Sequence, residues 1–160
     1  MRILLLSDSH GDRSGIRLIA TRASAAARLD AVLHMGDGAS DFIGLTSFFQ
    51  ALNPEIALHG VRGNCDWSAS VPEQLVLSLG GARLLLTHGH HLQVKHTLVL
   101  LDEEAAAQGC SIALFGHTHE PAMEMRHALL LNPGSAADGR YGLLELNEGK
   151  PRVQIGRAHV

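Results

Sequence analysis

The residues ILLLSDSHG at positions 3–11 join an uninterrupted aliphatic run to a polar turn that contains glycine. The same arrangement, an apolar run of strand length before a turn with glycine and Asp, Asn or His, recurs four more times. These turns are His34-Met35-Gly36-Asp37-Gly38, Arg62-Gly63-Asn64-Cys65-Asp66, Thr87-His88-Gly89-His90 and Gly116-His117-Thr118-His119. In open α/β sheets ligands bind outside the carboxyl ends of the strands, so strands that share one region of a sheet would bring these turns together.

Helical and extended patterns alternate along most of the chain. Helices are predicted, with Ser14 as the cap of the first, over residues 15–29, 41–52 and 92–108. Strands are predicted over residues 2–6, 31–34, 56–61, 74–79, 82–87, 111–115, 122–126, 128–131, 141–146 and 152–154. Helices that alternate with strands early, followed by strands in succession, predict an α/β protein with mixed sheets.

The pattern predicts one domain. No internal repeat, low-complexity tract or linker interrupts it, so residues 1–154 are expected to fold as a single unit. Residues 155–160 continue no pattern of the domain, and their sequence is similar to the translation of a common sequencing adapter. We therefore interpret 155–160 as a C-terminal tail, a candidate artefact without a function.

Composition excludes several classes of protein. The chain has 160 residues, of which 46% are hydrophobic, and a net charge of −3, so it is not expected to be disordered. Its aliphatic run near the start is far shorter than the ~20 residues that a membrane span needs, and no membrane association is expected. The charge offers no basic field for a stable nucleic-acid complex. Cys65 and Cys110 are predicted to be free thiols in a reducing cytoplasm.

Together the turns supply seven candidate metal ligands, which are Asp8, His10, Asp37, Asn64, His88, His117 and His119. Four imidazoles, two carboxylates and one amide oxygen suit Mn²⁺, Fe²⁺, Co²⁺, Ni²⁺ or Zn²⁺, and disfavour Ca²⁺ or Mg²⁺ alone. Seven side chains are too many for one tetrahedral ion. Two ions about 3.5–4 Å apart that share one carboxylate would use all of them, so the sequence predicts a dinuclear centre.

The ordered set Asp8-x-His10, Gly36-Asp37, Gly63-Asn64, His88 and Gly116-His117-Thr118-His119 resembles the calcineurin-like metallophosphoesterase superfamily. The short length and the Gly-Asn-Cys-Asp run resemble its small YfcE-like phosphodiesterase branch, over residues 1 to about 146. The resemblance implies a four-layer αββα sandwich with two mixed β-sheets. It also implies a phosphodiesterase whose metal-bridging hydroxide attacks phosphorus, with Mn²⁺ expected first and Ni²⁺, Co²⁺, Zn²⁺, Fe²⁺ or Mg²⁺ as alternatives.

The resemblance also implies roles for individual residues. Asp8, His10 and His119 would hold the first metal; Asn64, His88 and His117 would hold the second; Asp37 would bridge the two. The chain departs from the wider superfamily at Cys65, because many members have there a His that contacts substrate and protonates the leaving group. A thiol is a poorer acid for an alkoxide, so His90 and Asp66 are alternative proton donors. The candidate catalytic residues are Asp37, Asn64, Cys65 and His90.

Two functions are compared. A metal-dependent phosphoesterase that acts on a small phosphate ester is the first, and self-association into a homo-oligomer is compatible with the resemblance. The alternative is a non-catalytic protein-interaction scaffold, for which the retromer subunit of the same fold, which has lost several metal-binding histidines, is the precedent. All seven ligand positions are retained in this chain, which favours the enzyme.

Overall fold

The first sheet brings three of the polar turns to one edge. In this computed structural model, which describes residues 1–67 and 70–158, the strand order is β10-β9-β1-β2-β3. The strands β1 (Arg2–Leu6), β2 (Ala31–His34) and β3 (Ala57–Gly60) are parallel. Leu6 pairs with His34, and His34 pairs with Gly60, so the three strands end at the same level. Antiparallel β9 (Arg140–Asn147) and β10 (Lys150–Arg157) complete the sheet.

The second sheet carries the other two turns. Its order is β4-β5-β6-β8-β7, formed by β4 (Gln74–Leu79), β5 (Ala82–Thr87), β6 (Ile112–Leu114), β7 (Ala122–Met125) and β8 (Leu129–Asn132). The predicted hairpin turns at Gly80 and Gly81, both with positive φ, which glycine adopts without strain. Parallel β5 and β6 are paired up to Leu86 and Leu114, so their following turns also lie side by side.

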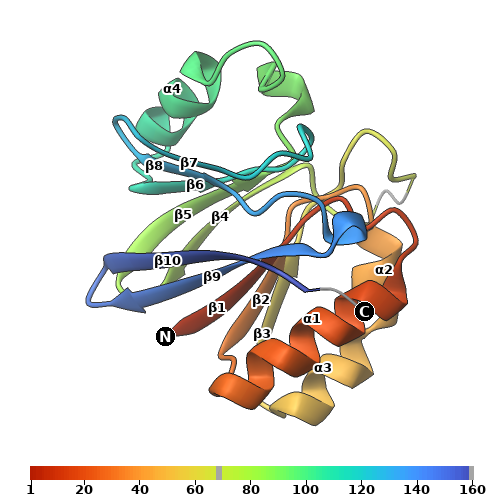
Figure 1. Ribbon diagram of the computed structural model, residues 1–160. Helices are drawn as coiled ribbons and strands as arrows, with labels where there is room; N and C mark the ends of the chain where they lie inside the picture. The colour runs from red at the N-terminus through yellow and green to blue at the C-terminus, as the bar shows by residue number, and fades with distance from the viewer. Residues whose placement is uncertain (68–69, 159–160) are drawn as a thin grey trace.

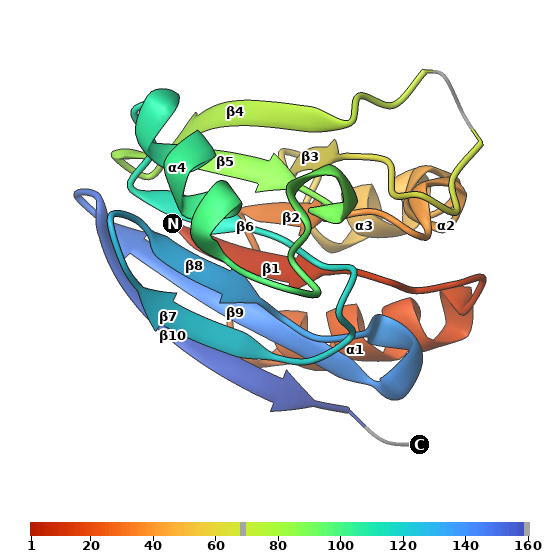
Figure 2. The same cartoon turned by 90° about the horizontal axis from the view of Figure 1, so that it is seen from above.

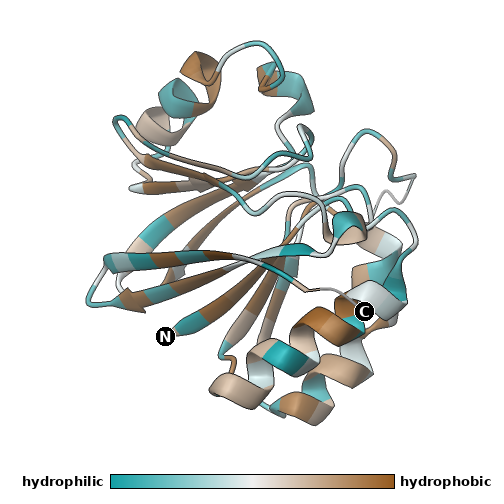
Figure 3. Ribbon diagram, in the orientation of Figure 1, coloured by the Kyte–Doolittle hydropathy of each residue, from teal (hydrophilic) through white to brown (hydrophobic). Residues whose placement is uncertain are grey.

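The two sheets face each other across an apolar core and are covered by helices on their outer faces (Figure 1). The helices α1 (Arg13–Ala26), α2 (Ala39–Gly44) and α3 (Thr46–Leu52) lie against the first sheet, and α4 (Val99–Ala107) lies over the second (Figure 2). Side chains between the sheets include Ile3, Leu5, Leu33, Leu84, Leu86, Ile112, Leu114, Leu131 and Leu144. The strands β1, β2, β5 and β6 are accordingly mostly hydrophobic (Figure 3). The expected four-layer αββα sandwich is confirmed.

The helices differ from the prediction at their ends. Asp12, not Ser14, caps α1, because its carboxylate accepts the backbone N–H of Gly15 at 2.9 Å. The helix expected over residues 41–52 is divided at Leu45 into α2 and α3. The helix expected over 92–108 is shortened to α4, since the chain first forms the 3₁₀ turn η1 (His90–Leu92) and Gln93 adopts a left-handed φ of 55°.

The last strand of the first sheet continues past residue 154, where the sequence predicted the end of the domain. β10 pairs with β9 in unbroken antiparallel register, and its last pair joins Arg157 to Arg140. Ala158 is buried and donates its N–H to the carbonyl of Gly139 at 2.7 Å. Backbone pairing therefore places 155–157 in the sheet although their side chains show no clear pattern; residues 159–160 of the predicted tail lie outside the described residues. Within the described ranges, no helix combines the length and apolarity needed to cross a bilayer.

Candidate metal centre

Six of the seven predicted ligands lie in two adjoining clusters at the shared end of both sheets. Five of these six adopt left-handed backbone conformations, with φ of 54° at Asp8, 44° at His10, 56° at Asp37, 69° at His117 and 63° at His119. Residues with a Cβ visit this region rarely, and such strain concentrates at functional sites, where the surrounding fold holds it. The turns after the strands therefore aim these side chains inward at a conformational cost.

The first cluster consists of Asp8, His10 and His119. Asp8 Oδ1 lies 3.2 Å from Nε2 of His119 and 3.7 Å from Nε2 of His10. The two imidazole nitrogens are 3.2 Å from each other. These are the residues expected to hold the first metal, drawn together from the turns after β1 and β6.

The second cluster consists of Asp37, His88 and His117. Asp37 Oδ2 lies 3.3 Å from His88 Nε2, and that nitrogen is 3.2 Å from His117 Nδ1. The same Asp37 oxygen is 4.0 Å from His10 Nε2, which belongs to the first cluster. Asp37 therefore lies between the two clusters, where a bridging carboxylate was expected.

The chemistry of these residues fits a divalent cation. Asp8 is fully buried, and its Oδ1 has no hydrogen-bond partner among the described residues, which is unusual for a buried carboxylate oxygen. Its Oδ2 accepts the Ser7 hydroxyl and the backbone N–H of His117. A cation between Asp8 and the two imidazoles of its cluster would satisfy the unpaired oxygen, and imidazole with carboxylate is a donor set for transition metals.

A backbone contact fixes the orientation of His88. Its Nδ1 lies 2.7 Å from the carbonyl of Met35, which can only accept, so Nδ1 carries the proton. The Nε2 lone pair is then left for the cluster, which is the usual arrangement of a metal-binding histidine.

The protonation states of Asp37 and His117 agree with ligation. Burial raises the pKa of Asp37, but the neighbouring His88 and the hydrogen bond from the backbone N–H of Cys65 outweigh it and hold that pKa well below its usual range. Burial, reinforced by the neighbouring His88, lowers the pKa of His117 to about 4. At neutral pH Asp37 is therefore ionised and His117 is neutral, as metal ligands must be.

The turn after β3 carries Asn64 and Cys65. Asn64 is exposed, and its side-chain nitrogen lies 3.7 Å from the sulfur of Cys65, so its ligand role stays a prediction. Cys65 offers its sulfur within 4.8 Å of ligand atoms of His10 and Asp37. Desolvation and the Asp37 carboxylate raise the pKa of the Cys65 thiol, which favours the protonated form.

His90 lies beside the second cluster. Gly89, with a φ of 97°, turns the chain so that the His90 ring centroid is 5.4 Å from that of His88 and 6.1 Å from that of His117. The structure thus brings His90 close to the predicted ligands without placing it among them.

Asp66, which the sequence offered as an alternative proton donor, is a positioning residue in the structure. One carboxylate oxygen accepts the backbone N–H groups of Asp37 and Gly63, both at 2.8 Å. The other accepts those of Gly38 at 3.0 Å and Ala39 at 3.1 Å. A Cβ at Gly63 would lie 2.1 Å from Asp37 Oδ1, so the two turns pack in close contact. Asp66 therefore joins the Asp37 turn to the Asn64 turn.

Further polar residues behind the turns were not predicted from the sequence. Asp41 accepts the Ser9 hydroxyl at 2.9 Å and the backbone N–H of Gly11 at 2.8 Å. Ser135 donates its hydroxyl to the carbonyl of Asp8 at 2.7 Å. These contacts hold the Asp8–His10 turn from two sides, and an isolated Asp in a helix or Ser in a loop gives no sequence signal for them.

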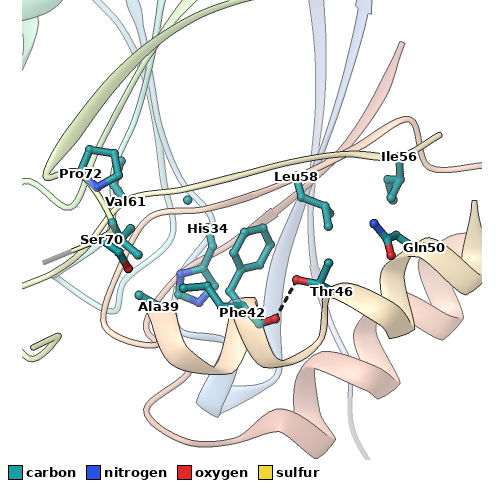
Figure 4. A pocket seen from close by; sticks show the side chains of 13 residues that line it. His34, Ala39, Phe42, Thr46, Gln50, Ile56, Leu58, Val61, Ser70 and Pro72 are labelled. Carbon is teal, nitrogen blue, oxygen red and sulfur yellow. Dashed lines mark hydrogen bonds between the residues drawn. The ribbon is translucent and has the colours of Figure 1, made fainter. Parts of the chain in front are cut away.

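His34 supports the centre from behind. It is fully buried, its Nδ1 accepts the N–H of Gly36 at 3.1 Å, and its Nε2 lies 3.0 Å from the hydroxyl of Ser9. It also borders a cavity of about 500 Å³ between β3 and the α2–α3 pair, which is lined by Phe42, Leu58 and Val71 among others (Figure 4). Burial lowers the pKa of His34 to about 4, against the partial opposition of Asp66 and Asp41.

This pKa shift makes stability fall in acid. Because the unfolded chain protonates His34 near pH 6.5 and the folded chain only near pH 4, the unfolded state binds the extra proton between these values. Lowering the pH from 7.5 to 5 should therefore cost about 2 kcal/mol through this residue. Urea unfolding at both pH values should show a smaller loss of unfolding free energy in His34→Gln than in wild type. An equal loss in the two proteins would contradict the role of His34.

Comparisons with known proteins agree with this site and fold. The calcineurin-like phosphoesterase superfamily domain matches residues 1–147. The probable metallophosphoesterase YsnB of Bacillus subtilis (strain 168) is 35% identical over 136 residues, which are 84% of this chain and 75% of the relative. The clustered acidic and imidazole ligands on this sandwich define the class of metal-dependent phosphoesterases. The chain belongs to the calcineurin-like phosphoesterase superfamily.

Solved structures show the same fold. A conserved protein from Streptococcus pneumoniae TIGR4, described as a predicted phosphoesterase, superposes with a TM-score of 0.78 at 29% identity, over 98% of this chain and 88% of that one. Vps29 from Entamoeba histolytica, solved in complex with Zn²⁺, superposes with a TM-score of 0.71 at 22% identity, over 99% and 98% of the two chains. The fold is therefore shared with proteins that differ widely in sequence.

Proposed function

We propose that this chain is a phosphodiesterase that works with two divalent metal ions. The observation that carries the proposal is the place of Asp37, whose Oδ2 lies 3.3 Å from His88 Nε2 and 4.0 Å from His10 Nε2. Asp8, His10 and His119 would hold one ion, and His88 and His117 with Asn64 would hold the other. When bound, such a pair supplies a water of lowered pKa and positive charge for the phosphoryl oxygens.

The residues of the chain prepare this centre before a substrate arrives. Asp66 and Asp41 hold the ligand-bearing turns through their backbone N–H groups. Met35 keeps the proton on Nδ1 of His88, so Nε2 faces the centre. A fixed set of donors spends little energy on rearrangement during the reaction, which is the main source of electrostatic catalysis.

Cys65 is proposed to act on the substrate side. It flanks the clusters, and the raised pKa of its thiol keeps it protonated at neutral pH. Cys65 and Trp67 line a pocket of about 210 Å³. Trp67 is 96% exposed, so its indole is free to cover an aryl or nucleobase group of a phosphodiester.

The proposed partner is a small phosphate ester in the cytoplasm. The net charge of −3 does not favour a stable nucleic-acid complex. Cys65 and Cys110 are both free thiols, as expected in a reducing compartment. A scaffold function is the alternative, and the two clusters of candidate ligands favour the enzyme over it.

Metal removal tests the proposal. Treatment with a chelator is expected to lower hydrolysis of an aryl phosphodiester by about 10²-fold or more, because the nucleophilic water depends on the ions. Single additions of Mn²⁺, Ni²⁺, Co²⁺, Zn²⁺ or Mg²⁺ should restore it, with Mn²⁺ the most effective. The matching monoester should react more slowly. Activity that survives chelation would contradict the metal mechanism, and a faster monoester would contradict the diesterase assignment.

A further inference from the structure

A second set of metal-ligating side chains lies at one end of the β4–β5 hairpin. Glu73 directly precedes β4, and His90 and His91 follow β5 within η1. Gln74 pairs with Thr87 in antiparallel register, so the two ends of the hairpin meet and bring Glu73 to the histidines. Each of the three residues offers a ligand atom within 4.8 Å of the other two.

The carboxylate of Glu73 is held in a defined orientation. Its Oε1 lies 3.2 Å from the Arg62 guanidinium, and its Oε2 lies 3.3 Å from Nε2 of His91. One oxygen is thus directed toward the imidazole while the other is fixed by the arginine. The side chains of Glu73 and His91 are 46% and 67% exposed, so an ion can reach them from solvent.

His90 supplies an independent sign of a missing partner. Its ring lies against that of His91, with centroids 4.0 Å apart. Its Nδ1 is buried and has no hydrogen-bond partner among the residues that the structure describes. Buried polar atoms are nearly always paired, and an unpaired one points to an absent water or ion.

We propose that Glu73, His90 and His91 form an auxiliary site for a zinc-type cation, separate from the Asp37 centre. Two imidazoles and one carboxylate are a donor set that Zn²⁺ takes with its remaining position open. Neutral imidazole also suits Cu²⁺ and Ni²⁺, whereas Mg²⁺ and Ca²⁺ prefer oxygen ligands. The nearby positive charge of Arg62 opposes a cation, so this site binds more weakly than the Asp37 centre.

The test is a count of bound zinc in metal-stripped full-length protein. Wild type, Glu73→Gln and His91→Ala are dialysed against the same free Zn²⁺, and the metal is measured by mass spectrometry. Each variant should hold one equivalent less than wild type near saturation, or need at least tenfold more free Zn²⁺ for it. The control is His96→Ala, which removes another exposed histidine, four residues after the end of η1. Its zinc content should match that of wild type.

Unchanged zinc content in both Glu73→Gln and His91→Ala would overturn the auxiliary site, as would an equal loss in His96→Ala. Unfolding temperatures of all variants confirm that they are folded, and two exposed positions keep the test decisive if one variant is unstable. The count does not depend on catalysis. An inactive enzyme that still shows the one-equivalent difference contradicts only the proposed phosphodiesterase, and an active enzyme without that difference contradicts only this site.

Discussion

Asp37→Asn is expected to lower kcat/KM for an aryl phosphodiester on the order of 10³-fold in the Mn²⁺-supplemented protein. The change keeps the shape of the side chain but removes the negative charge that lies between the two ligand clusters, 3.3 Å from His88 and 4.0 Å from His10. Both proposed ions lose a ligand at once. Steady-state kinetics and metal content, measured on the same preparation, give the result.

Asp102→Asn is the matched control for this substitution. Asp102 lies on α4 and accepts the backbone N–H groups of His127 and Ala128, so it makes the same kind of contacts away from the ligand clusters. The activity of Asp102→Asn should stay within about twofold of wild type, since a change this far from the ligand clusters leaves the contacts with the transition state intact. If Asp37→Asn retained a comparable rate with its fold intact, the bridging role would be wrong.

Asp66→Ala is expected to weaken metal binding by 10- to 100-fold, although Asp66 is not proposed as a ligand. Its carboxylate accepts four backbone N–H groups from the Asp37 and Asn64 turns, and alanine leaves all four without this acceptor. Stability should fall by roughly 2–4 kcal/mol for the same reason. Metal titration and urea unfolding measure the two effects.

Asp12→Ala is the control for Asp66→Ala, because it should lower stability without affecting the metal site. Asp12 caps α1 with a single hydrogen bond to Gly15, so its removal should cost about 1 kcal/mol and leave metal affinity unchanged. A metal affinity in Asp66→Ala equal to that of wild type would show that the turns keep their positions without the carboxylate.

Much of the candidate site could be predicted from the order of residues because each ligand follows an apolar strand. The strand runs around Leu5, Leu33 and Leu114 are continuous in the chain, and their burial between the sheets follows from hydrophobicity alone. Glycine in each turn marks the change of direction. The types of ligand, and their division among separate turns, are therefore local properties of the sequence.

The supporting contacts could not be predicted in the same way. Asp66, Asp41 and Ser135 act through backbone groups that belong to distant segments, so their neighbours along the chain carry no sign of the contact. Helix ends were misplaced for a similar reason, because the left-handed Gln93 depends on the turn that follows β5.

The sequence by itself determined the strands, the candidate ligand residues and the family, since these depend on hydrophobic runs and on side-chain chemistry at fixed spacings. Only the tertiary structure decided that Asp37 lies between two clusters, that Glu73 meets His90 and His91, and that residues 155–157 extend the sheet. Those features are set by strand register and by backbone hydrogen bonds, which every residue can make and which therefore leave no mark in the identity of the residues.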